Sequence, residues 1–163
     1  MQCRGPQGEI LYLNEVRGNL PDIDLPLANS QVDHLFISIL SANDMEDSIG
    51  FYENLLDVRV NERHEIPYKT INRVYGLPLE TKHKLATLGA PRSVTLEIDQ
   101  TPSPKPPSEK LTEGIWMISF TVDTLDAAQG GVFNINEAPY NGARATTISG
   151  PSGEKVELIK LTS

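Results

Sequence analysis

The sequence predicts an α+β fold in which two βαβββ modules form a curled mixed sheet around a cleft, with the helices outside. The first observation is an internal sequence repeat: the segment Gly5-Pro-Gln-Gly-Glu-Ile-Leu-Tyr-Leu13 closely resembles Gly150-Pro-Ser-Gly-Glu-Lys-Val-Glu-Leu158. The second is that Val32-Asp-His-Leu-Phe-Ile-Ser-Ile-Leu40 matches Ile115-Trp-Met-Ile-Ser-Phe-Thr-Val-Asp123, and a helical stretch follows each. Repeated supersecondary units constrain a fold more strongly than any single residue does.

The repeats divide the chain into a short N-terminal part and one domain. We expect an N-terminal strand and linker over residues 1–30, and a domain over 31–162. Within the domain, modules 31–100 and 113–162 are joined by residues 101–112. This connection is rich in proline, which excludes a helix interior or a central strand, so we interpret it as a stiff connector.

The individual elements follow from hydrophobic periodicity and from turn residues. The first module begins with a strand, and Asn43 or Asp44 then offers an N-cap oxygen to an amphipathic helix that ends near Asp57. In the second module, Gly130-Gly131 should cut the helix short. The expected strands cover 9–16, 32–40, 58–65, 84–88, 93–100, 115–122, 143–148 and 154–161, and the expected helices cover about 44–57, 70–75 and 124–130.

Composition excludes several classes of partner. The 163 residues carry a formal net charge of −8, which argues against nucleic acid and anionic membranes, since both need a basic surface. The chain has one cysteine, Cys3, so an internal disulfide is excluded. No apolar run approaches the length of a membrane span, and no secretory signal follows the first residue. We expect a cytoplasmic protein.

Alternation along the strands assigns side chains to two faces. One face is aliphatic and suits packing under a helix; it should hold Leu35, Ile37, Ile39, Val94, Leu96, Ile98, Trp116, Ile118, Phe120, Val156 and Leu158. The other face should line the cleft, with His34, Phe36 and Ser38 on the first strand. His34, Glu97, Met117 and Glu157 hold equivalent positions in the repeat, so we expect them to converge. Two glutamates that meet on such a face repel unless a cation or a proton lies between them.

Four segments together resemble the vicinal-oxygen-chelate superfamily of glyoxalases, epimerases, extradiol dioxygenases and bleomycin-resistance proteins. They are Val32-Asp-His34, Ser48-Ile-Gly-Phe-Tyr-Glu-Asn-Leu-Leu56, Leu96-Glu-Ile98 and the closing Gly150-to-Leu158 segment. The resemblance covers residues 31–162. It implies a divalent metal held by one residue from each of four strands, which here fall on His34, Glu97, Met117 and Glu157. Mn, Mg, Fe, Ni and Zn are the metals to expect.

Met117 departs from that pattern, because the superfamily usually has a histidine at this position. A thioether is a soft, neutral ligand that suits Cu(I) far better than the other ions. Methionine therefore either tunes the metal site or abolishes it, in which case Met117 packs in an apolar pocket. If a metal binds, His34, Glu97 and Glu157 hold it; if none binds, one glutamate has a raised pKa and acts alone as an acid or base.

Three functions stay open. The first is a lyase or isomerase in which a metal assists proton transfer beside a carbonyl of a small molecule, with Glu97 or Glu157 moving the proton. The second is a metal-free module that binds a small ligand, similar to the bleomycin-resistance proteins. The third is a degenerate domain within a larger assembly. The expected substrate cleft includes Phe36, Met117, Ser119 and Arg73; His64 and His83 are interpreted as surface residues.

The N-terminal echo leaves two explanations. Residues 5–16 resemble the last strand of a preceding module, with Tyr12 at the position of Glu157. The chain is then the C-terminal part of a longer protein, or the extra strand pairs with a sheet edge in its own chain or in a second subunit. An exposed strand edge is a liability unless it is covered. We therefore expect residues 9–16 to pair with something, and a homodimer or a missing N-terminal domain as partner.

Overall fold

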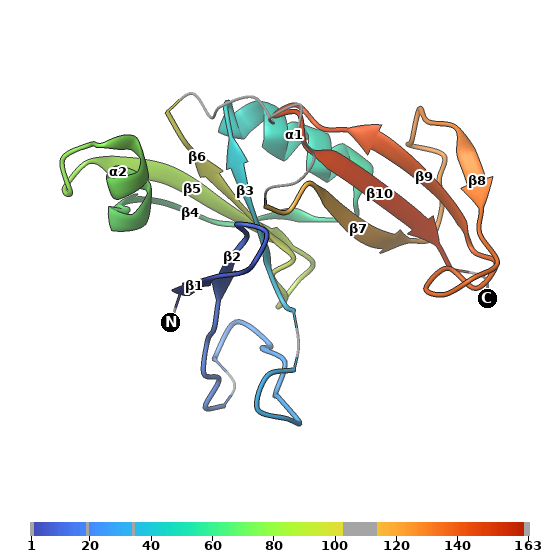
Figure 1. Ribbon diagram of the computed structural model, residues 1–163, viewed down its shortest axis with the longest axis horizontal. Coiled ribbons are helices and arrows are strands. Elements are labelled where there is room, and N and C mark those ends of the chain that lie inside the picture. The colour runs from blue at the N-terminus through green and yellow to red at the C-terminus, as the bar shows by residue number, and fades with distance from the viewer. Residues whose placement is uncertain (1, 19, 34, 103–113, 162–163) are drawn as a thin grey trace.

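The computed structural model describes residues 2–18, 20–33, 35–102 and 114–161. Within them, the chain forms two mixed sheets of four strands, a separate two-stranded hairpin and two helices (Figure 1). The sheets do not join into a closed barrel. This arrangement confirms the α+β class and the two repeated halves. No helix of the described residues is long and apolar enough to cross a membrane.

The first sheet comes from the first half of the chain. Its order is β3-β6-β5-β4, with β3 and β6 parallel and the other neighbours antiparallel. Two helices belong to this half: α1 connects β3 to β4, and α2 connects β4 to β5. The elements are β3 (Ser38–Ala42), α1 (Met45–Leu55), β4 (Arg59–Pro67), α2 (Lys69–Tyr75), β5 (Lys82–Gly89) and β6 (Leu96–Gln100).

The second sheet repeats this pattern in the second half. Its order is β7-β10-β9-β8, with β7 and β10 parallel and the other neighbours antiparallel. The short strand β8 was not expected from the sequence. The elements are β7 (Met117–Val122), β8 (Val132–Asn134), β9 (Arg144–Ser149) and β10 (Lys155–Lys160).

Helix α1 forms where the sequence places a cap and an apolar stripe. The side chain of Asp44 accepts hydrogen bonds from the backbone of Glu46 and Asp47, which satisfies two of the amide groups left free at a helix start. Met45, Ile49 and Tyr52 follow at helical spacing, and all three are buried. The helix therefore presents one apolar face to the core, as expected.

One helix serves the core of both sheets. The buried cluster joins α1 to residues of the first sheet, such as Leu96 and Ile98, and to Val156 and Leu158 of the second. Figure 1 shows α1 above the junction of the two sheets. Tyr52 makes the connection specific: it is fully buried, its ring lies 6.2 Å from that of Phe120, and its hydroxyl donates a 2.9 Å hydrogen bond to Glu154.

The helix expected over about 124–130 is absent, so that prediction was wrong. Thr124 Oγ1 accepts a hydrogen bond from the backbone of Asp126, but only a turn follows. Only six residues, Thr124 to Gln129, precede the pair Gly130-Gly131, and glycine is costly inside a helix. Trp116 also differs from expectation, since it precedes β7 and is 48% exposed rather than part of the core.

His83 is buried, which corrects its interpretation as a surface residue. Its Nε2 lies 2.6 Å from Asn72 Oδ1 of α2. Because the Asn72 amide nitrogen donates to the carbonyls of Leu79 and Thr81, its oxygen is the acceptor and His83 Nε2 is the donor. These hydrogen bonds join α2 to β5. Hydrophobic periodicity does not predict them, because it concerns apolar side chains.

The N-terminal strand is shorter than expected and pairs with a strand that lies next to it in the sequence. β1 (Gln2–Arg4) and β2 (Ile10–Tyr12) form an antiparallel hairpin. A tight turn closes it, in which Gly8 has a φ of 87° that favours glycine. Tyr12 Oη lies 2.8 Å from Tyr68 Oη at the start of α2, so the hairpin also contacts the first half of the domain.

The first strand differs in both extent and facing. β3 begins at Ser38 rather than near Val32, and it ends at Ala42. Ile39 pairs in register with Glu97, whereas Ser38 pairs with Leu96. Neighbours in register share a face, so Ile39 lies on the face of Glu97 and Ser38 on the core face. The expected facing of these two residues was therefore wrong; the pairing of β3 with β6 sets it, and the sequence does not show that register.

Candidate functional site

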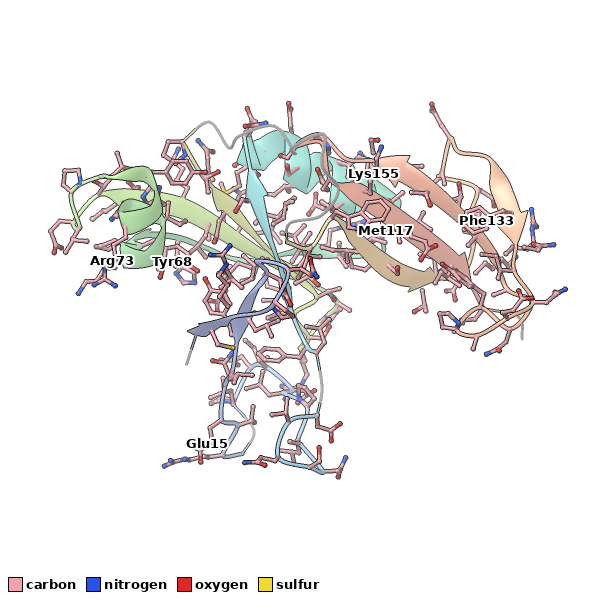
Figure 2. The ribbon with its side chains drawn as sticks, in the orientation of Figure 1. Glu15, Tyr68, Arg73, Met117, Phe133 and Lys155 are labelled. Carbon is pink, nitrogen blue, oxygen red and sulfur yellow. The ribbon has the colours of Figure 1, made fainter. Side chains whose placement is uncertain are left out.

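The second sheet carries a polar group on the face opposite α1. Glu157 of β10 pairs in register with Ser119 of β7, and Val156 and Leu158 on either side of it are buried in the core. Lys155 and Met117 form the preceding register pair on the same face, and Figure 2 shows them side by side. The regular ladder thus fixes these four side chains relative to one another.

Glu157 is a buried carboxylate with both oxygens occupied. It is 3% exposed; Ser119 Oγ donates to one oxygen over 2.6 Å, and Tyr140 Oη donates to the other over 2.8 Å. Burying a charge is costly unless hydrogen bonds compensate, and hydroxyl groups supply that compensation here. The hydrogen bond to Glu157 raises the pKa of the Tyr140 phenol, so its proton stays on Tyr140.

Tyr140 comes from the loop between β8 and β9. Turns hold this loop: the Tyr140 backbone amide donates to Glu137 O, and the Gly142 amide donates to Ile135 O. The Tyr140 ring meets the edge of Phe133 with centroids 6.3 Å apart. The loop therefore positions the Tyr140 phenol over the second sheet, although Tyr140 itself lies in no strand.

The first sheet carries two carboxyl groups on one face. Glu97 and Asp99 alternate along β6, with Thr87 and Leu85 of β5 beside them. Burial raises the pKa of both groups, and the neighbouring Glu97 further raises the pKa of Asp99, to about 8. Their side chains also share a hydrogen bond. A proton held between them removes the repulsion of two buried charges.

Asp99 has an oxygen that the described residues leave without a partner. The side chain is 3% exposed, and its Oδ1 makes no hydrogen bond. The neighbouring Tyr68 has a raised pKa, caused first by burial, then by its hydrogen bond to Tyr12 and by the charges of Asp99 and Glu97. The carboxyl pair and the two tyrosines thus form one electrostatic group on the first sheet.

The structure distributes the other expected site residues widely. His34 lies outside the described residues. Phe36 is half-buried in the segment before β3. Arg73 is exposed on α2, and Figure 2 shows it at the opposite end of the molecule from Phe133 on the second sheet. Of the expected residues, Ser119 and Glu157 are the pair joined by a hydrogen bond.

Sequence reasoning missed Asp99 and Tyr140. Asp99 had a signal, because alternation puts it on the face of Glu97 within the same strand. Tyr140 had none, since the segment before β9 shows no periodicity and its position depends on loop geometry.

The four-strand metal centre that the sequence suggested includes His34, which lies outside the described residues. The described part of the chain contains no group of three or more His, Cys, Asp and Glu side chains that could hold a metal ion. Both oxygens of Glu157 accept hydrogen bonds from hydroxyl groups, and Met117 offers a soft thioether. Hydroxyl groups therefore compensate the Glu157 charge in the described structure.

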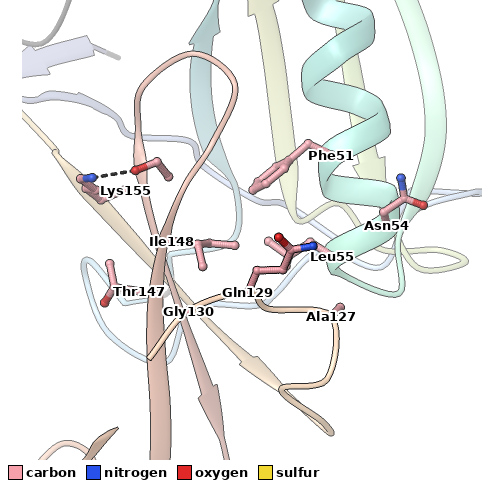
Figure 3. A pocket seen from close by; sticks show the side chains of 10 residues that line it. Phe51, Asn54, Leu55, Ala127, Gln129, Gly130, Thr147, Ile148 and Lys155 are labelled. Atoms are coloured by element: carbon pink, nitrogen blue, oxygen red, sulfur yellow. Dashed lines mark hydrogen bonds between the residues drawn. The ribbon is translucent and has the colours of Figure 1, made fainter. Parts of the chain in front are cut away.

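A separate cavity lies between α1, the loop around residues 127–130 and strands β9 and β10 (Figure 3). Its volume is about 510 Å³. The missing second helix explains it, since the loop that replaces that helix forms one wall. A Cβ on Gly130 would lie 2.3 Å from Thr146 Oγ1, so this loop approaches β9 closely. The cavity is lined by Phe51, Asn54, Leu55, Ala127, Gln129, Gly130, Thr147, Ile148, Ser149 and Lys155.

Two four-stranded mixed sheets that repeat one strand order, with α1 packed against both, define a glyoxalase-like class of protein. The sequence model of the Glyoxalase/Bleomycin resistance protein/Dioxygenase superfamily matches residues 31–158. The chain belongs to this superfamily. No curated protein matches the sequence closely enough to count as a relative.

Solved structures show the same fold at low identity. Glyoxalase I from Zea mays is 19% identical with a TM-score of 0.53; the match covers 78% of this chain and 46% of that one. A glyoxalase family protein from Bacillus cereus is 16% identical with a TM-score of 0.57, over 83% and 98% of the two chains. Another from Enterococcus faecalis is 18% identical with a TM-score of 0.54, over 77% and 96%. The chain thus spans less than half of the maize enzyme.

Proposed function

We propose that this domain binds a small organic molecule at Glu157 without a resident metal ion, as a binding module of the bleomycin-resistance type. One observation carries the proposal: Glu157 is buried, and hydroxyl protons from Ser119 and Tyr140 occupy both of its oxygens. These donors replace the stabilisation that a cation would give. Met117 beside them adds an apolar surface suited to an organic ligand.

A second candidate is a lyase or isomerase with metal-assisted proton transfer. The observation that favours it is the unpartnered Oδ1 of Asp99, beside Glu97, since a buried carboxylate oxygen without a hydrogen bond is a place for a cation or a proton. In this candidate, His34, Glu97 and Glu157 hold Mn, Mg, Fe, Ni or Zn, and Glu97 or Glu157 moves the proton. Phe36, Met117, Ser119 and Arg73 then border the substrate.

Calorimetry on chelator-stripped protein separates the two candidates. We expect Mn²⁺, Mg²⁺, Fe²⁺, Ni²⁺ and Zn²⁺ to show no binding that depends on Glu157, because two hydroxyl donors already compensate its buried charge. Glu157→Gln keeps the shape of the side chain and removes the charge, so it is the matched control. Stoichiometric binding to the wild type that Glu157→Gln abolishes would contradict the metal-free proposal and support the second candidate.

We also propose that the segment before β3 packs against a second copy of this chain. Leu27, Val32 and Leu35 expose 56%, 71% and 85% of their surface, which is unusual for large apolar residues that lie so close in sequence. Sedimentation at micromolar concentration should show a dimer. Leu35→Glu should shift it toward monomer, while Leu79→Glu, an exposed residue after α2, should not. A wild-type monomer over this range would contradict the second copy as partner.

A further inference from the structure

We infer that the cavity beside α1 is a second binding site, for a small neutral molecule that joins an apolar ring to a secondary amide. The inference goes beyond the proposed function, because neither Glu157 nor its two hydroxyl partners line this cavity. The volume of about 510 Å³ lies within the range of pockets that hold small ligands. The space is already present in the folded chain, so a ligand can enter without displacing a side chain.

The apolar part of the cavity suits a ring. Phe51 and Leu55 come from the C-terminal half of α1, and Ile148 comes from β9; Figure 3 shows Phe51 extending from the helix toward the strand. All three side chains pack against the core cluster but are only partly buried. A ring between them would remove further apolar surface from water, which favours binding.

Beside these side chains, part of β9 has no strand partner on its outer side. Among the described residues, β8 pairs with β9 only over residues 144–146, whereas β9 continues to Ser149. Ser149 lies in register with Lys155 of β10, but the Lys155 amide donates to Trp116 O on the opposite side. Residues in register on antiparallel strands alternate between exchanging hydrogen bonds and exchanging none. Ser149 therefore turns its backbone N–H and C=O away from β10, toward the side that β8 does not reach.

The polar part of the cavity suits an amide. Ser149 lines the cavity, and its backbone offers one donor and one acceptor, the same two groups that an amide ligand brings. Asn54 and Gln129 add two side-chain amides to the rim. Of the described lining residues, Lys155 alone carries a charge, and it already donates to Ser149 Oγ over 2.7 Å. A carboxylate ligand has no proton for the Ser149 carbonyl, so the lining favours a neutral amide over an anion.

Titration of the wild-type protein with matched probes tests the inference. N-methylbenzamide and methyl benzoate have nearly the same shape, but only the amide carries an N–H; benzoate tests the anion. The amide should bind at least about threefold more tightly than the ester, because it alone can donate to the Ser149 carbonyl. Backbone amide NMR shifts should change most in residues 51–55, 127–130 and 147–149, which line or border the cavity. Glu157→Gln should bind the amide as tightly as the wild type does.

A variant that fills the cavity tests the location independently. Ala127 is an exposed residue of the cavity wall, so Ala127→Trp should weaken binding of the amide severalfold while the fold is kept. Ala90→Trp, at an exposed alanine in the turn after β5, is the matched control and should keep the wild-type affinity. If circular dichroism shows that Ala127→Trp is unfolded, Asn54→Trp fills the cavity from an exposed position on α1 instead.

Several results would overturn the inference. They are equal affinities for amide and ester, tighter binding of benzoate, no binding of the amide at millimolar concentration, and unchanged affinity in the cavity-filling variant. Metal binding that depends on Glu157 would contradict the proposed function but leave this inference intact, since Glu157 does not line the cavity.

Discussion

Tyr52→Ala should lower the free energy of unfolding by about 3–5 kcal/mol, the usual cost of deleting a large buried aromatic ring. Tyr52 is fully buried in α1, and its ring contacts Phe51 and Phe120. Its hydroxyl also reaches Glu154 in the turn before β10. The loss therefore weakens the contact between the helix and the second sheet. Urea unfolding followed by circular dichroism would measure the change.

Two variants separate the causes of that loss. Tyr52→Phe removes only the hydrogen bond to Glu154, so we expect a cost of about 1–2 kcal/mol. Phe51→Ala deletes a ring of similar size from the adjacent, partly exposed position and should cost less than Tyr52→Ala. If Phe51→Ala proves as damaging as Tyr52→Ala, then Tyr52 has no special part in joining the helix to the second sheet.

Asp99→Asn should make the protein more stable at pH 8 and reduce the dependence of its stability on pH. Burial and the neighbouring Glu97 raise the pKa of Asp99 to about 8 in the folded state. Between about pH 4 and pH 8 the folded chain therefore binds more protons than the unfolded chain, so wild-type stability falls as the pH rises through this range. One pKa unit corresponds to about 1.4 kcal/mol, so the fall from pH 5 to pH 8 is on the order of 3 kcal/mol.

Urea unfolding at pH 5 and pH 8 would measure this difference. Asparagine does not ionise, so most of the fall attributed to Asp99 should disappear in Asp99→Asn. Asp126→Asn, at an exposed carboxylate in the loop after β7, is the matched control and should follow the wild type. A wild-type stability that is unchanged or higher at pH 8 would show that the pair with Glu97 is not protonated at neutral pH.

The sequence predicted those features of the fold that depend on local periodicity. The cap at Asp44 and the stripe of Met45, Ile49 and Tyr52 predicted α1, and alternation placed Val156 and Leu158 in the core on either side of Glu157. The internal echo predicted two matching halves. Each of these signals lies within a few residues of the element that it predicts, so no knowledge of distant contacts is needed.

The failures concern contacts between distant segments. His83 is buried because Asn72 of α2 folds onto it, and Tyr140 reaches Glu157 only through the geometry of its loop. The predicted facing of Ser38 and Ile39 was wrong because it depends on their register with Leu96 and Glu97 of β6, which the sequence does not show. For the candidate site, alternation placed Ser119 and Glu157 away from the aliphatic face, but it could not show which groups would contact the carboxylate.

The sharing of α1 by both sheets has a consequence for how the domain comes apart. Among residues 114–161 the second sheet has no helix of its own, and its core residues Val156 and Leu158 belong to the same buried cluster as Leu96 and Ile98 of the first. Separation of the two halves would expose apolar surface on both at once. The internal duplication therefore does not produce two independent folding units: the halves are energetically coupled through one helix and should unfold in a single cooperative transition.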